Sequence, residues 1–121
     1  MEHSKNILVI EDQLLVALDF ENQLRSFGYS PVNNATNYRQ AIKRINDTNP
    51  DLILLDIILK DGPTGFKVAK VAQAKNIPIV FVTASTQTSF FKKAKEYHPK
   101  AILHKPVNTQ ELKHAVDKLF N

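Results

Sequence analysis

The sequence predicts an α/β protein, (βα)5, in which five strands form one doubly wound parallel sheet. Two observations point to this class. Five short apolar runs alternate with five longer segments whose apolar residues recur at helical spacing. The runs are apolar almost throughout, as in strands covered by helices on both faces. We expect strands at residues 6–11, 29–34, 51–59, 77–83 and 101–104, and helices at residues 13–27, 37–47, 66–75, 86–97 and 108–120.

The first half of the chain holds two well-marked strands and a weak one. The first strand is a nearly continuous apolar run that ends in acid, and Gly28 is suited to the C-terminal end of the first helix. Pro31 interrupts the second strand, which favours a position near an edge of the sheet. Thr36 or Asn37 is a cap for the second helix. The third strand is the most apolar, with a single Asp56 inside it.

The second half begins with a loop at residues 60–65, which is rich in turn residues. After the third helix, the fourth strand is a buried apolar run followed by small residues. The fifth strand is short and ends at Lys105-Pro106. Asn108, with Glu111 three residues later, resembles a capping box at the start of the last helix.

Composition excludes several classes of protein. The 121 residues suffice for one core, and we expect a single domain spanning residues 1–121. Cysteine is absent, which removes disulfide frameworks, thiol catalysis and Cys-ligated metals. No apolar run approaches the roughly 20 residues of a membrane helix. The N-terminus lacks the pattern of a signal peptide, and we expect a cytoplasmic protein without membrane contact.

Charge is distributed unevenly along the chain. Residues 1–59 hold 5 Lys/Arg and 8 Asp/Glu, a net charge of −3, whereas residues 60–121 hold 11 and 4, a net charge of +7. The pI of about 9.4 raises the hypothesis of nucleic-acid binding. The lysines are spread over several segments, however, so a solvated surface is the preferred interpretation.

The carboxyl ends of the strands carry the chemistry. Ligands of open parallel sheets bind beyond these ends. In the order 2-1-3-4-5, the first and third strands are neighbours about 4.8 Å apart, so Glu11, Asp12 and Asp56 crowd one pocket. A cation and an ammonium relieve the repulsion among three carboxylates. An all-oxygen pocket suits Mg²⁺, and the long side chain of Lys105 can reach Asp56.

This set of groups matches phosphoryl transfer to an aspartate. Asp56 is the nucleophile that attacks in line. Mg²⁺ and Lys105 neutralise charge on the equatorial oxygens, and the Thr83 hydroxyl donates a hydrogen bond to one of them. The product is an acyl phosphate.

The same residues resemble the receiver domain of response regulators in two-component signalling. The resemblance covers nearly all of the chain, in the order that the family shows. It rests on the acidic pair Glu11-Asp12, Asp56 in LILLDIIL, Thr83-Ala84 and Lys105-Pro106, each at a strand end. It implies a flavodoxin-like fold.

The resemblance also implies roles for individual residues. Asp56 is the phosphorylated residue, Lys105 pairs with it, and Thr83 is a switch hydroxyl that turns inward after phosphorylation. Mg²⁺ is bound by the carboxylates of Asp12 and Asp56 and by the backbone carbonyl of Ile58, while Glu11 acts through metal-bound water. The peptide bond before Pro106 is often cis in this family.

Two departures from the family pattern bear on the switch. Receivers usually carry Tyr or Phe three residues before the lysine, and this chain has Ile102 there. The aromatic half of the coupled switch is therefore missing. Lys100 replaces a common Gly before the fifth strand, and the loop after Leu59 lacks a common proline.

The resemblance also implies which classes of protein interact with this chain. The phosphoryl donor is a phosphohistidine on a sensor histidine kinase or a histidine phosphotransfer protein, and the downstream protein target is unknown. We expect no turnover substrate, and a monomer or weak homodimer. The initial Met and complete first strand favour a stand-alone regulator over an excised receiver.

Other functions are weaker alternatives. A Mg²⁺-dependent phosphohydrolase of the haloacid-dehalogenase type needs a second acid two residues after the nucleophile, where this chain has Ile58. A basic nucleic-acid-binding module lacks a helix-turn-helix signature and aromatic stacking motifs. A flavin carrier is disfavoured because the loop after the first strand is acidic and repels phosphate.

Overall fold

The computed structural model describes residues 3–60 and 62–120. The strands are β1 (His3–Ile10), β2 (Tyr29–Ala35), β3 (Leu52–Asp56), β4 (Ile79–Thr83) and β5 (Ala101–His104). The helices are α1 (Leu14–Ser26), α2 (Tyr38–Thr48), α3 (Gly65–Ala74), α4 (Thr88–Lys95) and α5 (Thr109–Phe120).

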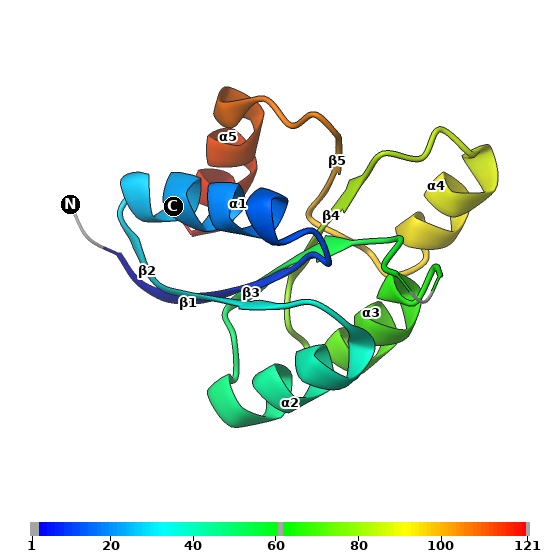
Figure 1. Cartoon of the computed structure of the whole chain (residues 1–121), viewed down its shortest axis with the longest axis horizontal. Helices are drawn as coiled ribbons and strands as arrows, with labels where there is room; N and C mark the ends of the chain where they lie inside the picture. Colours follow the sequence, from blue (N-terminus) through cyan, green and yellow to red (C-terminus); the bar gives the residue numbers. More distant parts are fainter. Residues whose placement is uncertain (1–2, 61, 121) are drawn as a thin grey trace.

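The five strands form one parallel sheet in the order β2-β1-β3-β4-β5. Helices α1 and α5 cover one face, and α2, α3 and α4 cover the other (Figure 1). The predicted fold class, strand order and edge position of the second strand are confirmed. All five strands point their carboxyl ends the same way, so the residues that follow them share one rim.

Alternation along the strands divides the core into two layers. In β1, Ile7 and Val9 pack under α1 and α5, whereas Leu8 and Ile10 pack under α2 and α3. Successive side chains of a strand point to opposite faces. Both faces of the central strands are therefore apolar, which is why the sequences of these strands are continuous apolar runs.

Several element boundaries differ from the expected ones. β1 begins at His3 because its first residues pair with Tyr29 and the residue after it in β2. β3 ends at Asp56 instead of residue 59: its pairing with β1 stops at Leu55, and the Ile58 N–H donates to the Asp56 carboxylate at 3.2 Å. β4 begins at Ile79, directly after Pro78, which has no N–H to donate.

The predicted helix ends are borne out at three positions. The side chain of Asn37 accepts a hydrogen bond from Gln40 N at 2.8 Å at the start of α2. Asn108 accepts from Gln110 N at 2.7 Å before α5. Gly28 has φ +98°, the left-handed backbone that follows many helices. The peptide bond before Pro106 is cis.

A buried tyrosine ties β2 to α5. The Tyr29 hydroxyl, which is fully buried, donates a hydrogen bond to the Asp117 carboxylate. Burial, together with this bond and the charge of Asp117, raises the pKa of Tyr29 above its ordinary value. The phenol is therefore held in its neutral form well into alkaline pH.

Tyr29→Phe is expected to lower the free energy of unfolding by about 1 kcal/mol near neutral pH, through loss of this hydrogen bond. Above about pH 10 an unfolded tyrosine ionises, whereas the folded one stays protonated, so the wild-type protein loses this advantage as pH rises. Urea unfolding at several pH values measures the difference. Tyr38→Phe, at a half-buried position on α2, is the control. A difference that does not narrow at high pH contradicts the assignment.

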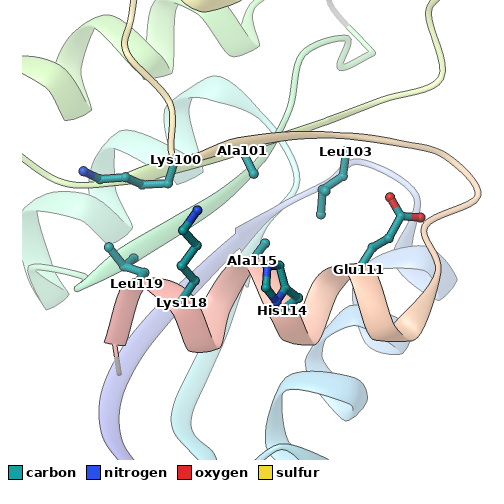
Figure 2. Close-up of a pocket in the computed structure, with 8 residues that line it drawn as sticks. All are labelled: Lys100, Ala101, Leu103, Glu111, His114, Ala115, Lys118 and Leu119. Carbon is teal, nitrogen blue, oxygen red and sulfur yellow. The ribbon is translucent and has the colours of Figure 1, made fainter.

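A cavity of about 560 Å³ lies between the edge strand β5 and helix α5, away from the rim (Figure 2). We call it the β5–α5 groove; it is lined by Lys100, Ala101, Leu103, Glu111, His114, Ala115, Lys118 and Leu119. Within the described ranges, no helix has the length and apolar character needed to cross a membrane.

Candidate functional site

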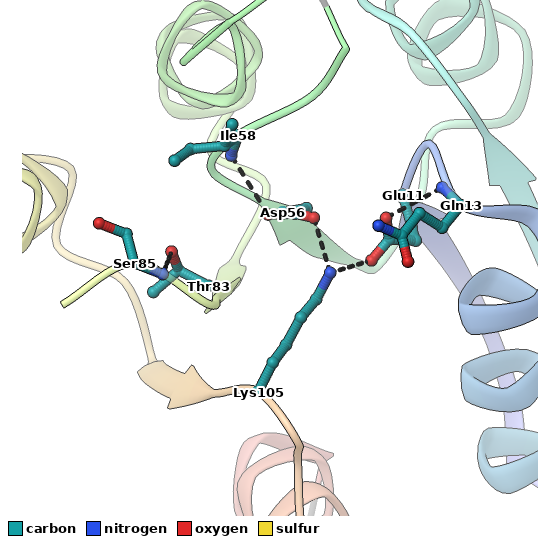
Figure 3. Close-up of polar contacts among 7 residues, drawn as sticks. All are labelled: Glu11, Gln13, Asp56, Ile58, Thr83, Ser85 and Lys105. Atoms are coloured by element: carbon teal, nitrogen blue, oxygen red, sulfur yellow. Dashed lines mark hydrogen bonds and ion pairs between the residues drawn. The ribbon is translucent and has the colours of Figure 1, made fainter.

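Three charged side chains from three strands meet at the rim of the sheet. Asp56 is the last residue of β3, Glu11 follows β1, and Lys105 follows β5. Lys105 Nζ donates to Asp56 Oδ2 at 2.8 Å and also pairs with Glu11 Oε1 (Figure 3). The predicted contact between Lys105 and Asp56 across the intervening strand is present.

Burial makes this contact electrostatically necessary. Only 1% of Glu11 and 6% of Asp56 is exposed, and a buried carboxylate without a counter-ion is strongly disfavoured. Burial by itself lowers the pKa of Lys105, but its hydrogen bonds and ion pairs with Asp56 and Glu11 outweigh it and raise that pKa. Lys105 therefore remains an ammonium, and one positive charge serves two buried anions.

Asp12 completes an acidic cluster. Carboxylate oxygens of Glu11, Asp12 and Asp56 lie within 4.8 Å of one another. Burial first, and then its interaction with Glu11, raises the pKa of Asp12, although Lys105 opposes the shift. The cluster carries more negative charge than Lys105 balances. A hard divalent cation with oxygen ligands fits such a donor set, so the residues present could hold a metal.

A small cavity opens beside the cluster. It measures about 270 Å³ and is lined by Asp12, Gln13, Asp56, Ile58, Leu59, Ala84, Ser85 and Lys105. The acidic side chains are held in place by backbone amides: Ile58 N donates to Asp56 Oδ1 at 3.2 Å, and Gln13 N donates to Glu11 Oε2 at 3.1 Å. The space is large enough for a phosphoryl group and several waters.

Thr83 lies beside the cavity rather than in its wall. Its side chain is buried, and Thr83 Oγ1 accepts a hydrogen bond from Ser85 N at 3.0 Å (Figure 3). Because Ser85 lines the cavity, this bond links the hydroxyl to the loop before α4. The hydroxyl accepts in this bond, so its own hydrogen is still available to donate.

At the position where the family pattern has an aromatic residue, this chain has Ile102, which packs against the core. Ile102 is half-buried against the core layer under α2, α3 and α4. An aromatic contact occurs two residues later, where the rings of His104 and Phe91 lie 4.8 Å apart. His104 is the register partner of Thr83. A ring on β5 thus contacts α4, at the residue that pairs with Thr83 in the sheet.

Sequence reasoning missed three features of the site. It paired Lys105 with Asp56 alone, although the burial expected of a carboxylate at the end of β1 was a signal for the second pair with Glu11. It did not single out Gly65, whose backbone lies against Asp56. It also overlooked Leu14 and Leu15 of α1, which are 58% and 81% exposed.

The family model for the response regulator receiver domain matches residues 7–117. Among curated proteins, the chain is similar to the transcriptional regulatory protein PdtaR of Mycobacterium tuberculosis, with 28% identity over 93% of this chain and 55% of the relative. It is 27% identical to the chemotaxis protein CheY of Bacillus subtilis, over 95% of this chain and 97% of the relative. The chain spans about half the length of PdtaR and of the PhoB relative from Klebsiella pneumoniae.

Solved structures show the same architecture. The signal receiver domain of a modulated diguanylate cyclase from Desulfovibrio desulfuricans G20 superposes with a TM-score of 0.87 at 31% identity. The match covers 97% of this chain and 94% of that one.

Proposed function

Since the chain belongs to the response regulator receiver domain family, we propose that Asp56 accepts a phosphoryl group from a phosphohistidine and thereby switches a protein-docking surface. The chain is a receiver domain of a two-component system, a family in which phosphorylation-dependent switching is typical. The observation that carries the proposal is the meeting of Asp56, Lys105 and the acidic cluster at one rim.

The proposed step is an in-line displacement. A carboxylate oxygen of Asp56 forms the new P–O bond while the P–N bond of the phosphohistidine breaks, and the bond's electron pair returns to the imidazole. Lys105, already 2.8 Å from Asp56 Oδ2, balances the charge of the arriving phosphoryl oxygens. Ile58 and Leu59 line one side of the cavity and limit the access of water.

Mg²⁺ is the proposed cofactor, and when bound it neutralises charge on the phosphoryl oxygens and orients them. Asp12 and Asp56 would hold it through their carboxylates, together with the backbone carbonyl of Ile58, and Glu11 would contribute through a bound water. The support is the short separation of the three carboxylates and the excess negative charge of the cluster.

Thr83 is the proposed switch. After phosphorylation its hydroxyl leaves the bond from Ser85 N and donates to a phosphoryl oxygen. The supporting observation is that this bond joins Thr83 to the loop before α4, so its loss frees that loop to move. The His104–Phe91 contact offers a second connection to α4.

The test is to incubate the protein with Mg²⁺ and acetyl phosphate and to measure intact mass. We expect one labile phosphoryl adduct, and none when the metal is chelated. Sustained turnover of phosphate esters would favour the phosphohydrolase alternative instead. Binding of DNA by the protein that weakens with salt but does not change on phosphorylation would favour the nucleic-acid alternative.

The proposed donor is a sensor histidine kinase or a histidine phosphotransfer protein, and it docks on α1. Leu14, Leu15 and Leu18 are exposed on this helix, which begins shortly after the acidic pair, and Ile58, which lines the cavity, is exposed too. Exposed apolar side chains grouped around a reactive site indicate a surface that a partner covers.

Leu15→Asp is expected to slow phosphorylation by a phosphohistidine protein roughly tenfold, because the change removes apolar contact and adds a charge to the interface. Phosphorylation by acetyl phosphate, which needs no docking, is expected to be unchanged. Asn46→Asp adds the same charge at an exposed position of α2, on the other face of the sheet, and is the control. Equal slowing with both donors contradicts docking at this surface.

A further inference from the structure

The positive charge of the helices is concentrated on one face of the sheet. Helix α2 has three basic residues and one acidic residue, α3 has two basic residues, α4 has three, and neither α3 nor α4 has an acidic residue. Their net charges are therefore +2, +2 and +3, whereas α1 and α5, on the other face, carry −1 and 0. The fold thus brings together, on the side of α2, α3 and α4 (Figure 1), basic residues that are spread over several segments of the sequence. We call this surface the basic face; it consists of Arg39, Lys43, Arg44, Lys67, Lys70, Lys92, Lys93 and Lys95.

The charges of the basic face are nearly all without counter-ions. All eight side chains are exposed. Among the residues that the structure describes, only Lys43 of this set forms an ion pair, with Asp47, and Lys93 lies over the ring of Phe66 at 4.8 Å. A concentration of like charge on one surface attracts ligands of the opposite charge. The basic face therefore suits a polyanion.

The basic face lacks the apolar anchors of a protein interface. In the described part of the chain, the large apolar side chains that are exposed belong to α1 and to Ile58, and none lies on α2, α3 or α4. Interfaces between folded proteins depend on a few buried aromatic or apolar anchors. Helices that lie on membranes likewise insert apolar side chains. A partner of the basic face is thus held by charge.

The aromatic rings of these helices are turned toward the core. Phe66 is buried, and Tyr38 and Phe90 are half-buried against the apolar layer under α2, α3 and α4. Proteins that bind single-stranded nucleic acid stack its bases on accessible aromatic rings. Duplex RNA is recognised largely through its 2′-hydroxyl groups, whereas a lysine acts as a point charge. Duplex DNA, with its bases enclosed and its phosphates outside, matches the basic face best.

From these observations we infer that the basic face binds the phosphate backbone of duplex DNA without reading its sequence, and that phosphorylation of Asp56 weakens this binding. Duplex DNA carries one negative charge per roughly 1.7 Å of its length, so it can contact basic residues on all three helices at once. A second copy of this chain is a poorer partner. Its basic face repels this one, and the helices of its other face carry only −1 and 0.

The second part of the inference rests on the proposed function. Helix α3 begins against the nucleophile, since a Cβ at Gly65 would lie 2.3 Å from the backbone oxygen of Asp56. A phosphoryl group adds a charge of about −1.5 to −2, and it would add it at the start of this basic helix. We expect phosphorylation to weaken DNA binding roughly threefold at low salt, and less at high salt, because ions screen the repulsion.

The test is to titrate the full, unphosphorylated chain into a short fluorescent DNA duplex of mixed sequence and to measure anisotropy. We expect a dissociation constant of roughly 10 to 100 µM at physiological salt, tighter binding as salt is lowered, and equal affinity for duplexes of different sequence. Lys67→Glu/Lys70→Glu on α3 and Lys92→Glu/Lys95→Glu on α4 should each weaken binding roughly tenfold, since each replaces two phosphate contacts by repulsion.

The matched control is Lys100→Glu/Lys118→Glu. It changes the net charge by the same amount at two exposed residues of the β5–α5 groove, which lies away from the basic face (Figure 2). Because only the overall charge changes, binding should weaken by no more than about threefold. All three variants should form the phosphoryl adduct at Asp56 as the wild type does, which shows that they are folded.

Several results would overturn DNA binding by the basic face: no change in anisotropy at low salt, equal weakening by the control variant, or tighter binding of single strands or duplex RNA. Tighter binding of poly-glutamate would overturn it in favour of an acidic protein, and tighter binding of anionic vesicles in favour of a membrane. An adduct that leaves the DNA affinity unchanged would overturn the second part. If no adduct forms while DNA binding persists, the proposed function has failed and the first part stands.

Discussion

The variant Asp56→Asn is expected to form no phosphoryl adduct with acetyl phosphate and Mg²⁺, whereas the wild-type protein gains one. The amide cannot supply the carboxylate oxygen that attacks phosphorus. Its shape is nearly the same, and its oxygen can still accept a hydrogen bond from Lys105. Intact mass after a short incubation at low temperature measures the adduct, which is labile as an acyl phosphate.

Stability separates lost chemistry from lost structure in this variant. Asp56→Asn removes one carboxylate from a cluster in which Lys105 also pairs with Glu11, so the free energy of unfolding should stay level or rise. Asp47→Asn, an exposed change on α2, should keep the adduct. An adduct of undiminished yield on Asp56→Asn would place the phosphorylated residue elsewhere and would remove the main support for the proposed function.

Gly65→Ala is expected to have the largest effect on stability of any single methyl group added near the site. A Cβ at residue 65 would lie 2.3 Å from the carbonyl oxygen of Asp56 and 2.6 Å from that of Ile57. Both are backbone atoms, and Gly65 N donates to Ile57 O at 3.0 Å, so neither side of the contact can move freely. We expect a loss of about 3 kcal/mol in the free energy of unfolding, measured by urea denaturation.

Gly62→Ala is the matched control for that change. A Cβ at residue 62 meets no atom within 4 Å, but φ at this residue is +106°. Its effect therefore comes from backbone strain alone and should be about 1 kcal/mol. If Gly65→Ala is no more destabilising than Gly62→Ala, the close approach of α3 to β3 is not a constraint on the fold.

Gly65→Ala should also impair phosphorylation, because the displaced backbone is that of Asp56. The yield of phosphoryl adduct per folded molecule is expected to fall. It is measured without denaturant, at a temperature where the variant is fully native. Normal yield would mean that α3 can shift without moving the nucleophile.

The element types and the strand order were predictable because they depend on local patterns. Apolar runs bounded by turn residues predicted every strand, and the caps at Asn37 and Asn108 were readable from residue type alone. The ends of β1 and β3 differ from the predicted ones because they depend on pairing with neighbouring strands. β1 gains residues from its pairing with β2, and β3 ends where Asp56 turns its carboxylate to an amide in the following loop.

For the site, the sequence predicted which residues lie close together. Parallel strands place their carboxyl ends at one rim, so Glu11, Asp56 and Lys105 had to lie near one another once the order of strands was assumed. How the three share charge was not predictable, because the reach of the Lys105 side chain depends on the positions of three separate strands. The same holds for Thr83, whose bond with Ser85 N depends on a loop conformation.

By itself, then, the sequence determined the class of fold and the identity of the charged residues at the rim, since both follow from periodicity and from residue type at strand ends. Only the tertiary structure decided that Lys105 serves two carboxylates, that Leu14 and Leu15 face outward, and that a groove lies between β5 and α5. The rotation of a helix about its axis and its spacing from a strand are set by packing among elements distant in the chain. Local pattern carries no direct record of either.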